Sequence, residues 1–185
     1  MPAYLLLILA ILSRVFLASF PHPDWFNFTA MGGALLYFGA RRNWREFLPI
    51  LPILMVTDYL LTTSVYAYPF RWQAYVTTWA WYLMAMALGQ ILLHSRTTFV
   101  RVAAGVVLGP TSFFVVSNFG VWAGGTMAPQ YPPTLTGLAT CFVAGLPFYR
   151  NDMLSTGIVA GLVFGVPVLV RRMKKTELQP ALIRK

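Results

Sequence analysis

Hydrophobic residues occur along this chain in long runs, which short polar, glycine-rich or proline-containing stretches separate. Such runs predict membrane helices, because about twenty consecutive apolar residues in a helix cross the hydrocarbon core of a bilayer. The runs cover Pro2–Ser19, Asn27–Ala40, Phe47–Ser64, Gln73–His94, Ala103–Val116, Leu135–Gly145 and Met153–Val170. The pattern therefore predicts an all-α membrane protein.

The run Leu135–Gly145 differs from the others in its length and in the residues after it. It has only about eleven residues, roughly half of what a spanning helix needs. A polar joint comes next, from Pro147 through Arg150 to Asp152. Proline interrupts helical hydrogen bonding, so we expect the chain to turn at this joint. The sequence therefore predicts six transmembrane helices plus one partly inserted extracellular segment.

The positions of the basic residues lead to the same count. Lysine and arginine concentrate in the cytoplasmic flanks of membrane proteins. The Arg41–Arg45 loop, the Arg96–Arg101 loop and the tail from Arg171 onward lie on one side of the membrane only if Leu135–Gly145 does not cross it. We therefore expect both termini in the cytoplasm, with a single transmembrane domain over residues 1–175 and a cytoplasmic tail over residues 176–185.

Composition limits the classes of protein and of partner. The 185 residues are 58% hydrophobic and 10% charged, which leaves too few charges to cover a soluble globule. The formal net charge of +9 raises the question of nucleic acid, but the basic residues flank apolar runs, as in membrane proteins. We therefore expect the lipid bilayer, and no nucleic acid, as a partner.

The one cysteine, Cys141, excludes an intramolecular disulfide and a cysteine-cluster metal site.

Two charged residues lie inside apolar runs, Asp58 in the third and Arg14 in the first. A charge within a span is costly, so it normally has a partner or faces a water-filled cavity. Asp58 is therefore a candidate for substrate binding, with a hydrogen-bonded packing role as the alternative. Arg14 is expected to face the bundle or to extend its charged end toward the interface.

Polar and aromatic groups are predicted to converge on the extracellular side, in the first outer loop, the aromatic second outer loop and the joint before the last helix. Asp58 lies within about two helical turns of that side. An outward-facing pocket roofed by loops is the resulting hypothesis. Its candidate substrate-binding residues are His22, Asp24, Asp58, Tyr66, Tyr68, Trp72, Trp79, Asn118, Arg150, Asn151 and Asp152.

Several short stretches carry a resemblance to a known family. They are Asn27-Phe28-Thr29-Ala30, Thr57-Asp58, Ser117-Asn118-Phe119-Gly120-Val121-Trp122, Tyr131-Pro132 and Leu146-Pro147-Phe148-Tyr149-Arg150-Asn151. Together they run over nearly the whole chain. The chain resembles the substrate-binding S components of energy-coupling-factor (ECF) vitamin transporters, and is most similar to an uncharacterised family of transport proteins related to them.

The resemblance implies an ECF S-component-like bundle in the bacterial cytoplasmic (inner) membrane. Such a protein binds a vitamin or similar small micronutrient from the outer side and mediates its uptake. S components dock on a membrane scaffold subunit driven by cytoplasmic ATPases, often through an Ala-x-x-x-Ala pattern in helix one. Here Ala10 is followed four residues later by Arg14, so this pattern is absent from helix one. Two alternatives therefore stay open: the protein docks on an ECF-type scaffold subunit, or it works alone.

Under this hypothesis Arg150 binds an anionic or carbonyl group of the substrate, Asp58 binds a cationic or amide group, and the aromatic residues stack on a ring. The chain has no phosphate-binding loop motif, so any ATP-driven step belongs to a partner. We predict no cofactor and no metal.

Two other function classes are alternatives. An intramembrane enzyme is disfavoured, because the two histidines, His22 and His94, are predicted on opposite sides and no nucleophile motif occurs. A non-transporting scaffold or assembly protein fits the glycines spaced four apart at Gly157, Gly161 and Gly165, which offer a face for another helix.

Overall fold

The computed structural model describes residues 1–19, 27–124 and 131–170. Within these ranges every regular element is a helix, which confirms the all-α prediction. Two π-helical turns, η3 and η5, continue α3 and α6, and two 3-10 turns, η2 and η4, lead into α3 and α4. The elements are α1 (Pro2–Ser19), α2 (Met31–Arg41), η2 (Trp44–Glu46), α3 (Phe47–Leu60), η3 (Leu61–Val65), η4 (Trp72–Tyr75), α4 (Val76–Leu93), α5 (Phe99–Gly124), α6 (Leu135–Ala160) and η5 (Gly161–Gly165).

Five helical segments in the described ranges are long and apolar enough to cross a bilayer, which indicates a multi-pass membrane protein. The first agrees with the predicted bounds, while α5 continues well beyond the predicted end at Val116. The five segments are Pro2–Ser19, Trp44–Val65, Trp72–Leu93, Phe99–Gly124 and Leu135–Val170.

The last of these segments corrects the prediction for the C-terminal part of the chain. Leu135–Val170 is one helical segment of 36 residues, so Leu135–Gly145 is not a separate inserted segment and the chain does not turn at Pro147. A membrane helix tolerates an internal proline when neighbouring groups support it. Here the Tyr149 hydroxyl lies 2.9 Å from Thr111 Oγ1 on α5 and its ring packs on Phe114. The six-helix count is therefore not confirmed.

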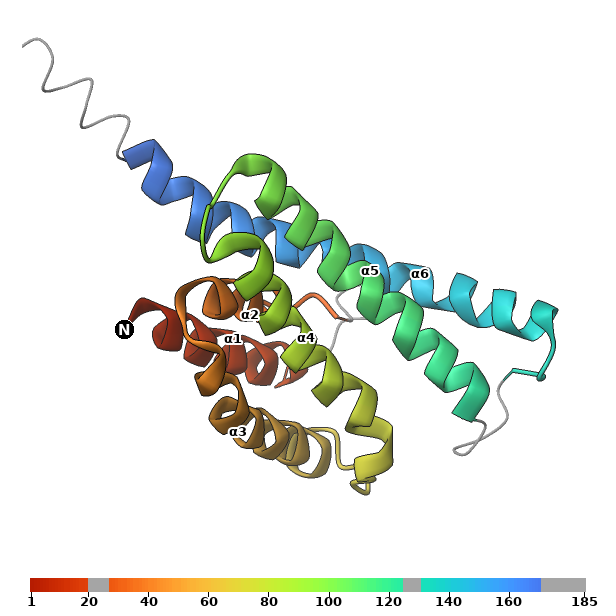
Figure 1. Cartoon of the computed structure of the whole chain (residues 1–185). Helices are drawn as coiled ribbons and strands as arrows, with labels where there is room; N and C mark the ends of the chain where they lie inside the picture. Colours follow the sequence, from red (N-terminus) through yellow and green to blue (C-terminus); the bar gives the residue numbers. More distant parts are fainter. Residues whose placement is uncertain (20–26, 125–130, 171–185) are drawn as a thin grey trace, which may run out of the picture.

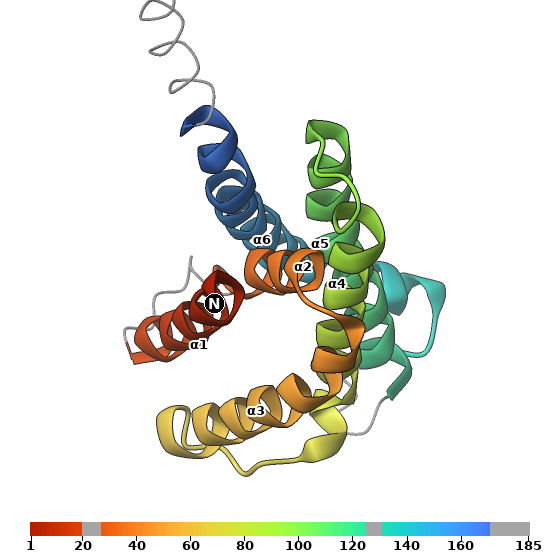
Figure 2. The ribbon, with the colours of Figure 1, turned by 60° about the vertical axis from the view of Figure 1, so that its left-hand side comes forward.

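The short helix α2 occupies the centre of the bundle, between α1, α4 and α6 (Figure 2). Nearly all of its residues are buried. Its backbone touches that of α4, because a Cβ atom at Gly39 would lie 1.9 Å from the carbonyl oxygen of Met86, and one at Gly89 would lie 2.1 Å from that of Leu36. Only glycine permits so close an approach at these two positions.

The C-terminal end of α2 lies where most of the basic side chains that the structure describes gather, and we call this the basic end. There the Arg41 guanidinium faces the Phe164 ring, His94 Nδ1 lies 3.3 Å from the Ala40 carbonyl, and Arg101 donates to the Leu92 carbonyl. Figure 1 shows the N-terminus of α1 and the last turns of α6 on the same side of the molecule.

A second contact at the basic end joins α1 to the turn after α2. Arg42 forms an ion pair of 2.7 Å with Glu46, and the Tyr4 hydroxyl also binds that carboxylate. Hydrogen bonding to Glu46 and then to Tyr4 raises the pKa of Arg42 above its usual value. The contact ties α1 to α2 at this end.

The length of α2 explains why the other half of the bundle is less filled. Eleven helical residues rise about 16 Å, roughly half of a hydrocarbon core of about 30 Å. Because α2 ends at the basic end, it fills only the half of the bundle nearer that end. In the opposite half, residues 27–30 lead into α2 beside the ends of longer helices.

Candidate functional site

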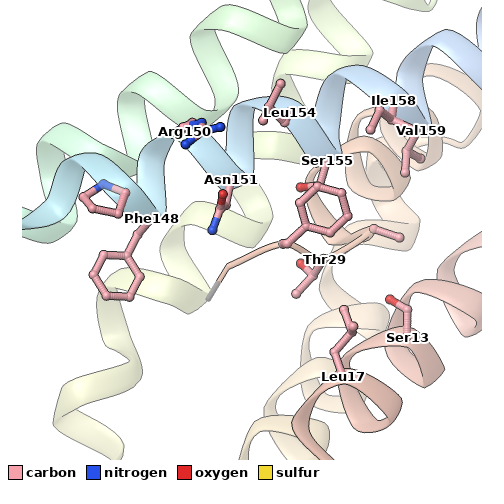
Figure 3. A pocket seen from close by; sticks show the side chains of 13 residues that line it. Ser13, Leu17, Thr29, Phe148, Arg150, Asn151, Leu154, Ser155, Ile158 and Val159 are labelled. Carbon is pink, nitrogen blue, oxygen red and sulfur yellow. The ribbon is translucent and has the colours of Figure 1, made fainter. Parts of the chain in front are cut away.

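A cavity of about 860 Å³ lies between the C-terminal half of α1, residues 27–30 and the middle of α6 (Figure 3). We call it the α1–α6 cavity. Its volume is in the range of small-molecule sites. Most of its lining is apolar, with polar groups from α6, α1 and the segment before α2. The lining residues are Ser13, Leu17, Phe28, Thr29, Ala30, Pro147, Phe148, Arg150, Asn151, Leu154, Ser155, Ile158 and Val159.

Arg150 is the charged residue of this lining. Its side chain is exposed and makes no hydrogen bond or ion pair with any residue that the structure describes. At 1.5 Å of rise per residue it lies about 21 Å along α6 from Phe164, which contacts Arg41 at the basic end. A hydrocarbon core is about 30 Å thick, so Arg150 lies in the third of such a core that is farthest from the basic end, where its long side chain can reach the interface.

Polar side chains of α6 and of the segment before α2 line the cavity beside Arg150. Figure 3 shows Asn151 and Ser155 pointing from α6 toward Thr29 and α1, while Arg150 and Leu154 follow the outer edge of α6. The Ser155 hydroxyl donates to the Asp152 carbonyl, so its oxygen can still accept. The site therefore combines one cation with several hydrogen-bonding groups on an apolar wall.

Asp58 does not line this cavity, because it is buried in an ion pair with Arg14. The two side chains are 2.7 Å apart, and the Asp58 side chain is inaccessible to solvent. Two further groups donate to the carboxylate, the Tyr82 hydroxyl at 3.1 Å and the Trp79 indole N–H at 3.0 Å. With its oxygens occupied in this way, Asp58 fits the packing role better than a contact with substrate.

Asp152 lies on a different face of α6 from Arg150. It is 6% exposed, and its carboxylate accepts a hydrogen bond of 3.3 Å from Thr156. With Asn118 it lines a second cavity, of about 400 Å³, between α5 and α6. Asn118 in turn donates to the Phe114 carbonyl. The structure therefore separates two predicted site residues, Asp152 and Asn118, from Arg150 and Asn151.

The predicted aromatic residues lie away from the α1–α6 cavity. Tyr66, Tyr68 and Trp72 are exposed near the ends of α3 and α4 that lie opposite the basic end. Trp79 stacks on Tyr75 and binds Asp58. The remaining two candidates, His22 and Asp24, lie outside the described residues.

Sequence reasoning missed the apolar part of the cavity and the partner of Asp58. Arg150, Leu154 and Ile158 are spaced four apart, so they share one face of a continuous helix. The expected turn at Pro147 hid this pattern.

Within the described residues, no group of three or more His, Cys, Asp or Glu side chains is placed to hold a metal ion.

A comparison with protein families matches residues 1–180 to a family of unknown function, DUF6580. Because the match covers nearly the whole chain, the protein belongs to this family. No curated protein and no solved structure matches the chain. A functional assignment therefore has to come from the geometry of the site.

Proposed function

We propose that this protein binds a small micronutrient in the α1–α6 cavity from the outer side of the bacterial cytoplasmic membrane and mediates its uptake. The observation that carries the proposal is the pairing of a cavity of about 860 Å³ with an arginine that has no partner among the described residues. Apolar walls with a few placed polar groups are typical of small-molecule sites. The S-component resemblance of the sequence supports the same function.

The distribution of charge supports the direction of uptake. Arg41, Arg42 and Arg45 lie at or next to the end of α2 that defines the basic end, and basic residues favour the cytoplasmic side. With that end in the cytoplasm, both termini are cytoplasmic. Arg150 then lies nearer the outer face, so the cavity receives its substrate from outside.

A scaffold function is the alternative, and one observation favours it. The glycine face of α6 lines an apolar groove of about 670 Å³ beside the N-terminal half of α5. Cβ atoms built at Gly161 and Gly165 would meet no other atom within 4 Å. Small residues of this kind let another membrane helix approach closely. The same face would equally suit an energising subunit of a transporter.

The test is mass spectrometry of small molecules extracted from the protein purified in mild detergent. Arg150→Ala is compared with Arg45→Ala, which removes an exposed arginine at the basic end. We expect one compound to be enriched with the parent and the Arg45 variant and to be lost with Arg150→Ala. If the parent enriches no compound even after incubation with a vitamin mixture, the binding function is wrong and the scaffold alternative gains support.

A further inference from the structure

The α1–α6 cavity opens toward the side of the bundle. Helix α1 packs mainly on α2 and η3, whereas α6 packs mainly on α5 and α2, so α1 and α6 flank α2 on different sides (Figure 2). Two residues of the cavity wall, Leu154 and Ile158, are 47% and 53% exposed. The wall is therefore continuous with the outer surface of α6, which in a membrane faces lipid.

The charge in the cavity selects the sign of the ligand. Among the described lining residues Arg150 is the one with a formal charge, because Asp58 and Asp152 both lie outside this lining. A guanidinium without a counter-ion in an apolar setting attracts an anion, and its planar fork matches a carboxylate. No described carboxylate of the cavity would repel such a group.

Along the face of α6 that carries Arg150, the order of polar and apolar residues gives the ligand an orientation. From Arg150 toward the basic end, Leu154 and Ile158 come next on the same helix face, and Ile158 lies about 12 Å deeper. On the exposed outer surface of α1, Leu12 and Phe16 are also apolar. A charged group bound at Arg150 would thus lie near the outer interface, with an apolar body directed toward the bilayer centre.

We propose that the substrate is a single-chain or ring-bodied amphipath with one carboxylate, which enters from the outer leaflet between α1 and α6. The carboxylate binds Arg150, and the apolar body lies along Leu154 and Ile158. This inference rests on the proposed function and specifies its substrate class and its route of entry.

The experiment uses the full chain in lipid nanodiscs and a fatty acid that carries a photoreactive diazirine near the end of its tail. Mass spectrometry maps the cross-links. We expect them on the Leu154–Ile158 face of α6 and on Leu17. Arg150→Gln should lower this labelling about tenfold, since a charge-assisted hydrogen bond is lost. Arg150→Lys keeps the charge but not the planar fork, so it should give labelling between those of the parent and of Arg150→Gln, and Arg45→Gln should have no effect.

Two controls are needed. The first separates recognition of the carboxylate from nonspecific hydrophobic binding, and the second separates entry between α1 and α6 from entry by another route. The matched fatty alcohol should label the parent and Arg150→Gln equally and weakly, because it lacks the carboxylate. Ile158→Trp narrows the side of the cavity and should lower labelling severalfold, whereas Ile91→Trp, on an exposed position of α4, should not. Labelling that is indifferent to Arg150, or equally strong with the alcohol, overturns the inference.

The inference and the proposed function fail in different ways. If a water-soluble compound is retained by the parent and lost with Arg150→Ala, while the fatty acid does not label the cavity, the binding function stands and entry from the bilayer is wrong. If neither the fatty acid nor any soluble compound binds, both proposals are wrong.

Discussion

Arg14 and Arg150 are both arginines within apolar helical segments, but their surroundings differ. Arg14 lies 2.7 Å from Asp58 and also donates to the Tyr82 hydroxyl at 2.9 Å, so its charge is neutralised inside the bundle. Arg150 is exposed at the rim of a cavity and has no partner among the described residues.

The difference shows that an intramembrane charge does not by itself mark a binding site. Asp58 and Arg14 each drew attention in the sequence because charges in apolar spans are costly. Once paired, they stabilise the contact between α1 and α3 and leave little capacity for a ligand. Arg150 keeps its hydrogen-bonding capacity and therefore is the better candidate. Three predictions, taken from the largest expected effect to the smallest, test this contrast.

Breaking the buried pair should have the largest effect. Asp58→Ala or Arg14→Ala leaves one charge buried without its partner, and should lower the free energy of unfolding by about 3 to 5 kcal/mol. The double variant Arg14→Leu with Asp58→Leu should recover part of this loss, because no unpaired charge remains. Thermal denaturation followed by size-exclusion chromatography measures the loss of stability in the single variants and its recovery in the double variant. Single variants as stable as the parent would contradict the buried ion pair.

Removing one hydroxyl from the same network should have an intermediate effect. Tyr82→Phe deletes the group that donates to Asp58 and accepts from Arg14. We expect a loss of about 1 to 3 kcal/mol, the cost of leaving buried polar groups without a partner. The matched control is Tyr68→Phe, at a position that is 68% exposed. Equal melting temperatures for the two variants would show that the Tyr82 hydroxyl is not part of the network.

Neutralising Arg150 should have the smallest effect on stability. Because its guanidinium has no partner among the described residues, Arg150→Gln should change the free energy of unfolding by no more than about 0.5 kcal/mol in the absence of ligand. The same thermal assay provides the measurement. A loss as large as that of Tyr82→Phe would mean that Arg150 holds the fold together, and the contrast with Arg14 would disappear.

Much of the fold could be predicted from the sequence, and the error at α6 has a definite physical source. The bounds of α1 agree with the prediction because its apolar run starts and stops with the helix. The prediction for α6 was wrong because Pro147 lacks an N–H, which normally signals a helix end. The contacts of Tyr149 with Thr111 and Phe114 on α5 support the helix just beyond that point. No pattern within α6 reveals those contacts.

The candidate site was predictable in part. Arg150 and Asn151 were among the predicted residues and line the cavity, since a charged cluster in an apolar chain is visible in the sequence. The pairing of Asp58 with Arg14 was not predictable, because the two residues are 44 positions apart in the chain and several polar groups competed as partners. The apolar wall was missed because Leu154 and Ile158 resemble any other lipid-facing residues.

By itself, the sequence determined the helical class, the membrane setting and the basic end, because these depend on composition and on local periodicity. Only the tertiary structure decided which charges are neutralised and where a cavity remains. The physical reason is that the space for a cavity depends on the length of α2 and on its backbone contact with α4 at Gly39 and Gly89, while the ion pair depends on how α1 and α3 meet. A short helix held at one end of the bundle leaves space at the other, and that space is where Arg150 lies.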